Sequence, residues 1–431
     1  MPQQTNTPKY LSSFVTLLVV LSCSTPRTEL PEAAPEDNGI AASNQDALKI
    51  ELGKRLFHDA TLSEPSGTSC ASCHDPKRAF VGHNDSSEPA VAQGSRPGEL
   101  GPRNTPTLTY LSFSPEFHFE KEEEVTSDGI TEISYVPTGG FFWDGRAQTL
   151  EEQAKSPFLA AHEMNNKDVP SLVTKVAAGE YSELFKEVYG TNAFDDSSRA
   201  FDLIADAIAA FEKSSTFHPF NSKFDAYLRG EVELTAQEEE GFQLFLAPEK
   251  GNCLACHVGD TDSRDPRDWL FTDFTYDNLG FPRNPAIPAT HDTAYFDLGL
   301  CRQEGLLNSI PEGFETDTLC GAFKVPTLRN SAVTAPYGHN GVFMGLRMVV
   351  LFYATRDTDP SRWYTNNSNG TLNKFDDLPR NYVENVNLDE VPYGQKAGER
   401  PRLNDREIDA LVAFLETLTD QEFSAKVRGL Q

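Results

Sequence analysis

The sequence of 431 residues predicts a mainly α-helical protein of two domains with long irregular loops, and three observations predict this class. A Cys-x-x-Cys-His motif occurs twice, at residues 70–74 and 253–257, which indicates two modules of one kind. Apolar residues recur mostly at helical spacing, whereas alternating strand patterns are scarce. Three stretches rich in Pro, Gly and Asn, residues 75–102, 260–323 and 357–402, are much longer than ordinary loops.

The N-terminal segment is expected to lie outside this fold. An apolar run from Tyr10 to Leu21 is too short to span a bilayer but suits the core of a signal peptide. Val20-Leu21-Ser22-Cys23 resembles a bacterial lipobox, in which the cysteine becomes the lipidated first residue. We therefore expect a signal peptide over residues 1–23, with cleavage by the general signal peptidase as the alternative. Residues 24–43 are rich in Pro, Glu, Ala and Ser and are expected to form a flexible tether.

Helical patterns follow in order along the chain. Leu48, Leu52 and Leu56 share one face of a helix expected over residues 44–57. Capping-box spacing indicates that helices begin after Thr149 and Thr235. Gly179 and Gly190 indicate helix ends. Two further apolar stripes are interpreted as core: Phe201, Ile204, Ile208 and Phe211, and then Ile408, Leu411, Val412 and Leu415.

The two Cys-x-x-Cys-His motifs have the chemistry of covalent c-type haem attachment. Two thiols three residues apart reach the two vinyl groups of one haem, and the adjacent imidazole reaches the iron. We therefore expect two haems, one held by Cys70, Cys73 and His74 and one by Cys253, Cys256 and His257. A single zinc site, or two redox pairs of thiols, is the alternative.

The other cysteines and the net charge agree with an exported protein. Of seven cysteines, one is assigned to lipid and four to haem, which leaves Cys301 and Cys320 for a disulfide in an oxidising compartment. Two separate buried thiols are the alternative. The formal net charge of -28 would repel nucleic acid and anionic membranes but attract a basic protein. We expect a periplasmic or cell-surface protein that meets the membrane only through its lipid anchor.

A boundary between two domains is expected at residues 215–221, where His218-Pro219 interrupts the helical pattern. It divides the chain into an N-terminal haem domain over residues 44–218 and a C-terminal haem domain over residues 219–431. This is a duplication of architecture rather than of sequence.

Six segments occur in a characteristic order from about residue 45 to about residue 420. They are Cys70–His74, Arg103–Thr107, Phe142–Arg146, Thr149–Glu163, Cys253–His257 and Lys324–Asn330, the last continuing to Tyr353. Together they resemble the bacterial di-haem cytochrome c peroxidase and MauG superfamily. The resemblance implies two cytochrome c-like domains, reaction with hydrogen peroxide at the N-terminal haem, and electron relay through the C-terminal haem.

The resemblance also assigns roles at the first haem. Glu163 follows Gln153 by ten residues, the spacing at which similar enzymes place a distal Gln and Glu, with Pro157 on the turn between them. A partly desolvated carboxylate suits proton transfer between the two oxygens of peroxide. A solvated surface residue is the alternative for Glu163. Trp143 corresponds to a tryptophan between the haems that assists electron transfer, a role compatible with core packing.

At the second haem the sequence selects one branch of the superfamily. Tyr353 lies where the peroxidase branch has an axial methionine and MauG has a tyrosine. An anionic phenolate stabilises ferric iron and favours higher oxidation states. Met348 and His339 are the rival ligands. His83 is interpreted as a loop residue rather than a displaceable ligand, so the first haem is expected to be open without activation.

Two further expectations concern an ion and a surface segment. Asn104, Thr334 and Pro336 match positions that bind calcium between the haems in the family, although a turn without an ion is the alternative. Residues 115–140 are rich in Glu and are expected to form a solvent-facing acidic loop.

Three functions are compatible with these features. The first is a MauG-like enzyme that reacts with hydrogen peroxide and oxidises a protein substrate. The second is a cytochrome c peroxidase that removes peroxide with electrons from a small redox protein. The third is a non-enzymatic electron carrier, which requires two strong axial ligands at each iron.

Overall fold

The computed structural model of the protein describes residues 44–82, 90–125, 131–303 and 310–425. The expected signal peptide with Cys23, the tether and His83 lie outside these residues. The described part of the chain belongs to one compact unit. None of the helices in this part is both long enough and apolar enough to cross a membrane.

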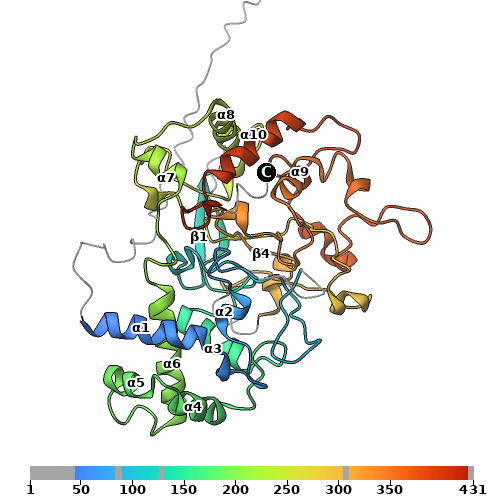
Figure 1. Ribbon diagram of the computed structural model, residues 1–431. Coiled ribbons are helices and arrows are strands. Elements are labelled where there is room, and N and C mark those ends of the chain that lie inside the picture. Colours follow the sequence, from blue (N-terminus) through green and yellow to red (C-terminus); the bar gives the residue numbers. More distant parts are fainter. Residues whose placement is uncertain (1–43, 83–89, 126–130, 304–309, 426–431) are drawn as a thin grey trace, which may run out of the picture. The chain divides into compact units, whose positions relative to one another are not determined.

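The fold is mainly α-helical, as predicted, and its long irregular loops contain short 3-10 turns and two short strands (Figure 1). The α-helices of the described residues are α1 (Asn44–His58), α2 (Cys70–Cys73), α3 (Leu150–Leu159), α4 (Val169–Ala178), α5 (Ser182–Tyr189), α6 (Ser197–Glu212), α7 (Lys223–Leu228), α8 (Ala236–Leu246), α9 (Leu346–Thr355) and α10 (Asp405–Glu416). The strands are β1 (His118–Val125), β2 (Thr131–Thr138), β3 (Tyr276–Asp277) and β4 (Phe323–Lys324).

Local sequence signals explain where these helices begin and end. The hydroxyl of Thr149 accepts a hydrogen bond from the backbone of the first turn of α3, and Thr235 caps α8 through a full capping box. Gly179 and Gly190 end α4 and α5. The apolar stripes of α6 and α10 are largely buried, as expected. These predictions were correct because each depends on neighbours within a few residues.

The apolar residues form two large cores. One contains side chains of α1, α3, α4, α5 and α6, and the other contains side chains of α7, α8, α9 and α10 together with Trp269 and Phe271. Each core adjoins one Cys-x-x-Cys-His motif, since α2 contacts α1 and the turn at Cys253 contacts α8. The division at residues 218 and 219 into two domains stays a prediction.

One helix crossing is repeated in the two halves of the chain. Gly53 on α1 lies so close to α6 that a Cβ atom would stand 1.8 Å from the carbonyl oxygen of Ala207. Gly241 on α8 lies in the same way against α10, where the corresponding distance to the oxygen of Ala410 is 1.9 Å. Only glycine permits backbones to approach this closely. The duplication of architecture is thus visible in the packing.

The acidic segment over residues 115–140 differs from its prediction as a loop. Strands β1 and β2 pair antiparallel, with His118 opposite Thr138 and Lys121 opposite Tyr135. Lys121, Glu122 and Glu123 are exposed, whereas Phe119 packs on Phe117 with 5.5 Å between ring centroids. The sequence shows no alternation of apolar and polar residues here because polar residues lie on both faces of the hairpin. Backbone hydrogen bonds between β1 and β2 hold the hairpin together.

A buried ion pair fixes the segment after the second motif. Arg329 and Asp225 are fully buried, with 2.9 Å between Nη2 and Oδ1. Arg329 Nε also donates to the carbonyl oxygen of Trp269 at 2.8 Å. The neighbouring Asn330 donates to Asp420, which also accepts from Tyr110 in the N-terminal half. This network holds residues 104–110 and 324–330 in register.

Candidate functional site

The two motif histidines are held in the same way. Nδ1 of His74 lies 2.9 Å from the carbonyl oxygen of Phe80, and Nδ1 of His257 lies 3.0 Å from that of Phe271. A protonated Nδ1 bonded to a carbonyl leaves Nε2 unprotonated and free to bind a metal. Burial lowers the pKa of each imidazole to about 4, so both rings are neutral at physiological pH.

A short repeated sequence holds the backbone next to each of these phenylalanines. Pro-Thr-Leu occurs at residues 106–108 and again at residues 326–328. Thr107 donates to the carbonyl oxygen of Ala79 at 2.6 Å, and Thr327 donates to that of Leu270 at 2.6 Å. Each acceptor directly precedes the phenylalanine that bonds the histidine. The sequence predictions above include both segments but not this internal repeat, which a direct comparison of residues 103–108 with residues 324–328 reveals.

A cavity of about 600 Å³ adjoins the first motif. Its lining brings together most of the residues predicted for the first haem and its surroundings, namely Cys70, Cys73, His74, Gln153, Pro157, Glu163, Trp143, Asn104, Thr334 and Pro336. The lining is largely apolar in character but also carries several ionisable side chains. It extends to residues 324–328 of the second half. The cavity therefore reaches from the first motif to the segment that supports His257.

Helix α3 and the turn after it carry the predicted distal residues. Gln153 is buried and lies one turn before Pro157 on the same face. Pro157 belongs to the last turn of α3 and not to a connecting turn, which corrects the expectation. Pro157 has no amide hydrogen to donate to the carbonyl of Gln153, and α3 ends two residues later. Asn165 and Asn166 bond backbone carbonyls next to this turn and do not line the cavity.

Glu163 is held against the loop that follows the first motif. Its amide donates to the oxygen of Ala160 at 3.0 Å, and its carbonyl accepts from the amide of Ser95 at 2.7 Å. Gly94 permits this approach, since a Cβ atom there would lie 2.3 Å from the oxygen of His162. Glu163 is partly buried and lines the cavity, so it is not a solvated surface residue. Burial raises the pKa of its carboxyl group, partly opposed by His162 and Arg146.

Trp143 is fixed at both its side chain and its backbone. The indole Nε1 donates to the carbonyl oxygen of Asn104 at 2.8 Å. Its own carbonyl accepts from the amide of Lys324 at 2.9 Å. The residue lies between segments that belong to the two motifs and lines the cavity.

Lys324 and Arg103 are among the cationic side chains that line this cavity. Lys324 is fully buried, and its Nζ donates to the hydroxyl of Ser114 and the carbonyl of Gly140. Burial lowers the pKa of Lys324 to about 7, and within the described ranges no carboxylate pairs with it. Arg103 instead binds Asp144 at 2.5 Å and Asp297 at 2.6 Å. Lys324 thus offers an uncompensated charge to an anionic group in the cavity.

Tyr353 on α9 lies near the second motif. Burial is the main cause that raises the pKa of Tyr353. The charges of Cys256, Asp277 and Cys253 raise it further. Met348 is on the same helix but is 47% exposed, which argues against a role as ligand in a buried site. His339 is stacked on Phe323 with 3.5 Å between ring centroids. Of the three candidates, Tyr353 is the buried side chain whose neighbours include the second-motif cysteines.

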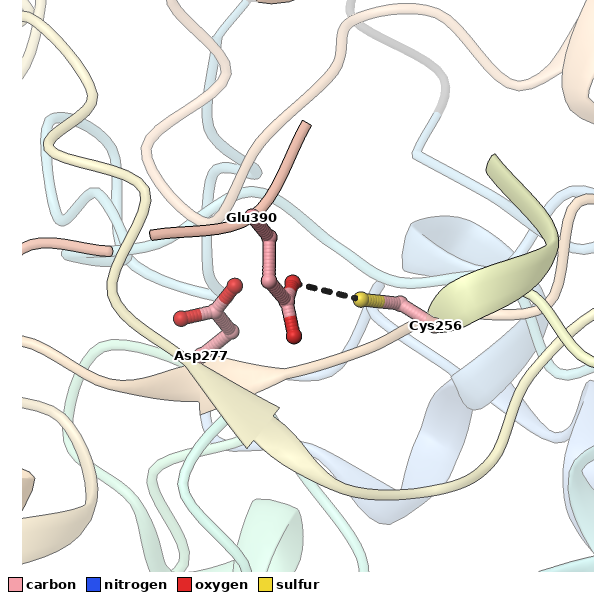
Figure 2. A group of neighbouring side chains, drawn as sticks. All are labelled: Cys256, Asp277 and Glu390. Carbon is pink, nitrogen blue, oxygen red and sulfur yellow. Dashed lines mark hydrogen bonds between the residues drawn. The ribbon is translucent and has the colours of Figure 1, made fainter. Parts of the chain in front are cut away.

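Cys256 is close to two acidic side chains (Figure 2). Its Sγ lies 3.6 Å from Oε2 of Glu390, and Asp277 completes a group whose ligand atoms lie within 4.8 Å of one another. These three side chains are the group of potential metal ligands found in the described part of the chain. Only one of them, Cys256, is a motif cysteine. None of the four motif cysteines forms a disulfide. The geometry therefore does not favour a shared zinc site.

The three residues expected to bind calcium lie together. Asn104 Nδ2 donates to the carbonyl oxygen of Pro336 at 2.7 Å and to that of Gly338 at 3.2 Å. Thr334 lines the same cavity. An ion would have to use Oδ1 of Asn104 and the Pro336 carbonyl, with further oxygen ligands from water.

Cys301 and Cys320 form a disulfide with 4.8 Å between Cα atoms. The alternative of two separate thiols is therefore wrong. Residues next to Cys301 line the cavity. Asp297, four residues before it, pairs with Arg103, and Gln303, two residues after it, donates to Asp144 at 2.9 Å. The disulfide thus lies next to these ion pairs along the chain.

Comparison with known proteins agrees with this arrangement. A family model described as di-haem cytochrome c peroxidase matches residues 47–233. The methylamine utilization protein MauG of Paracoccus denitrificans is 35% identical over 399 residues, which cover 91% of each chain. The chain belongs to the di-haem cytochrome c peroxidase and MauG family.

Other members of this family are also similar. Cytochrome c peroxidase Ccp of Escherichia coli is 33% identical over 300 residues, covering 69% of this chain and 50% of the relative. The diheme peroxidase BthA from Burkholderia thailandensis has a TM-score of 0.79 and 40% identity over 87% of both chains. A MauG-like protein associated with microbial copper homeostasis has a TM-score of 0.59 and 26% identity, covering 93% of this chain and 98% of that one.

Membership in the di-haem peroxidase family establishes the general chemistry. The protein is an enzyme that acts on hydrogen peroxide, contains two c-type haems and receives electrons from a redox protein. This excludes a purely non-enzymatic electron carrier. The residues at the first motif fit the cofactor, because a neutral imidazole with a free Nε2, two thiols and an unpaired buried cation surround one cavity.

Proposed function

We propose that this chain is a MauG-like peroxidase that reacts with hydrogen peroxide at the N-terminal haem and uses the oxidising equivalents on a protein substrate. Cys70 and Cys73 hold the first haem and Cys253 and Cys256 the second, with His74 and His257 as proximal ligands. The observation that carries the proposal is Glu163, a carboxyl group of raised pKa that lines the same cavity as His74. The alternative is peroxide removal with electrons from a small redox protein.

When bound, the haem would supply an iron that reacts with peroxide and the capacity to transfer electrons. The chain supplies the proton transfer. Glu163 takes a proton from one peroxide oxygen and returns it to the other, which turns the departing oxygen into water. Gln153 orients the peroxide through its amide, and Pro157 shapes the end of α3, which lies between Gln153 and the turn that carries Glu163. The cavity excludes bulk water because its wall is mostly apolar.

At the second haem we assign Tyr353 as the far-side ligand. The support is its place beside Cys253 and Cys256, together with the exposure of Met348. A phenolate ligand favours higher oxidation states, which suits an enzyme that stores two oxidising equivalents before meeting a large substrate. Trp143, bonded to segments of both motifs, is the relay between the haems.

Three further features belong to the same proposal. A calcium ion bound by Asn104, Thr334 and Pro336 would link the two motif segments. The chain would be exported, with Cys23 as a lipid anchor that places the enzyme in the periplasm or at the cell surface. Residues 44–218 and 219–431 would each form one haem domain.

Electron paramagnetic resonance of the ferric protein as isolated tests the proposal. We expect a high-spin signal from an open first haem and a low-spin signal from the second haem. Tyr353→Phe is expected to change only the low-spin signal, while the matched control Met348→Leu changes neither. Two low-spin signals would rule out an open first haem, and an unchanged spectrum in Tyr353→Phe would remove Tyr353 as ligand.

Turnover measurements separate the two uses of peroxide. Fast, saturable oxidation of a reduced small cytochrome would favour peroxide removal. Slow cytochrome oxidation, with peroxide-dependent modification of a protein added as substrate, would favour the MauG-like function.

A further inference from the structure

Glu212 is a buried acid in the wall of the first cavity that the chemistry above does not use. It is the last residue of α6, is only 6% exposed and lines the cavity. Its Oε2 is buried without a hydrogen-bond partner in the described part of the chain. Burial is the main cause that raises the pKa of the Cys70 thiol, and the charge of Glu212 raises it further, so Glu212 lies near the first motif.

The surroundings favour the protonated form of this side chain. Burial is the largest cause that raises the pKa of Glu212 to about 8, and the negative charge of Glu151 raises it further. Lys213 is the opposing charge. An unpaired carboxylate in an apolar wall would cost several kcal/mol, whereas a neutral acid costs much less. Glu212 therefore holds a proton at neutral pH.

We propose that Glu212 supplies a proton to the first-haem cavity during peroxide reduction. Conversion of one hydrogen peroxide to two waters breaks the O–O bond and consumes two electrons and two protons. The electrons come from the redox protein or protein substrate. Glu163 only moves a proton that peroxide already carries, so the consumed protons have to enter from outside. Glu212 delivers one of them and becomes a carboxylate.

A surface pair next to Glu212 can return the proton. Lys213 Nζ lies 2.6 Å from Oε1 of Glu151, and their side chains are 50% and 32% exposed. Glu151 acts electrostatically on Glu212 from α3, and Lys213 directly follows Glu212 as the C-cap of α6. The pair is thus open to solvent on one side and adjoins the buried acid on the other.

Infrared spectroscopy of the resting ferric holoenzyme tests the protonation directly. With carbon-13 in glutamate only, we expect the carbonyl band of a protonated acid at neutral pH that titrates away with a midpoint near the pKa of about 8. The band is absent in Glu212→Gln and retained in Glu187→Gln, a charge-matched control on the exposed surface of α5. A wild-type protein without a titrating band overturns the proposal, whether or not the variant folds.

Kinetics test the delivery step. Glu212→Gln is expected to slow steady-state peroxide reduction at least about ten-fold and to remove its decline at alkaline pH. Because this inference rests on the proposed peroxide site, Glu163→Gln is measured in parallel. If Glu163→Gln is slow while Glu212→Gln keeps the wild-type rate and pH profile, the inference fails and the peroxide site stands. If Glu163→Gln is unaffected, the peroxide site itself fails.

Discussion

Two ionisable residues of opposite type, Glu212 and Lys324, are buried in the wall of one cavity without a partner of opposite charge in the described chain. A protein of ordinary stability tolerates such groups only when they are neutral or when a bound group compensates them. Lys324 can meet a carboxylate of the haem, which carries two propionates. Glu212 has no such cation and stays protonated. Burial of these two residues therefore lowers the stability of the folded protein, and both lie in the wall of the cofactor site.

The protonation of Glu212 gives a pH dependence of stability. Its folded pKa of about 8 lies above the ordinary value of 4.5, so the folded state binds the proton more tightly. This contribution is fully present below about pH 4.5, falls as pH rises, and is lost above about pH 8. At about 1.4 kcal/mol per pKa unit the loss is on the order of 5 kcal/mol. Thermal unfolding of Glu212→Gln should lack this decline, and Glu187→Gln should keep it. Parallel wild-type and Glu212→Gln curves would contradict the assignment.

The helix crossings at Gly53 and Gly241 each involve a helix that contacts one of the two motifs. Glycine inside a helix normally costs about 1 kcal/mol relative to alanine. At Gly53 and Gly241 alanine is instead the less stable residue, because its methyl group would collide with a backbone carbonyl of the facing helix. We expect Gly53→Ala and Gly241→Ala each to destabilise the protein by about 1–3 kcal/mol. Chemical denaturation measures this, with Gly345→Ala as control since nothing lies within 4 Å of its added Cβ. A stabilised Gly53→Ala or Gly241→Ala would show that the helices are not in contact.

These elements also show what the sequence can and cannot predict. Thr149 and Thr235 were recognised as helix caps because the bonded amide is three residues away. Gly53 was not recognised, since the residue that requires it, Ala207, is far along the chain. Glu212 follows an apolar stripe and has the pattern of an exposed helix end. Its burial depends on how α6 meets the first motif, which no local pattern contains.

At the scale of the whole molecule, the net charge of -28 creates a field that acts before contact. Exposed Glu122 and Glu123 on β1 add to it locally. Such a field accelerates encounter with a basic electron donor and slows encounter with an acidic one. Salt screens this field, with a Debye length of about 10 Å at 0.1 M ionic strength.

We therefore expect the second-order rate constant for oxidation of a basic cytochrome to fall about ten-fold as ionic strength rises from about 0.01 M to about 0.2 M. An acidic donor should show the opposite trend, and an uncharged small-molecule reductant should show no trend. Stopped-flow oxidation of each reduced donor by the peroxide-treated enzyme measures these rates. Replacing Glu122 and Glu123 by Gln should reduce the salt dependence for the basic donor only if that donor docks at the hairpin. An equal salt response for all three donors would mean that the acidic surface serves solubility rather than encounter.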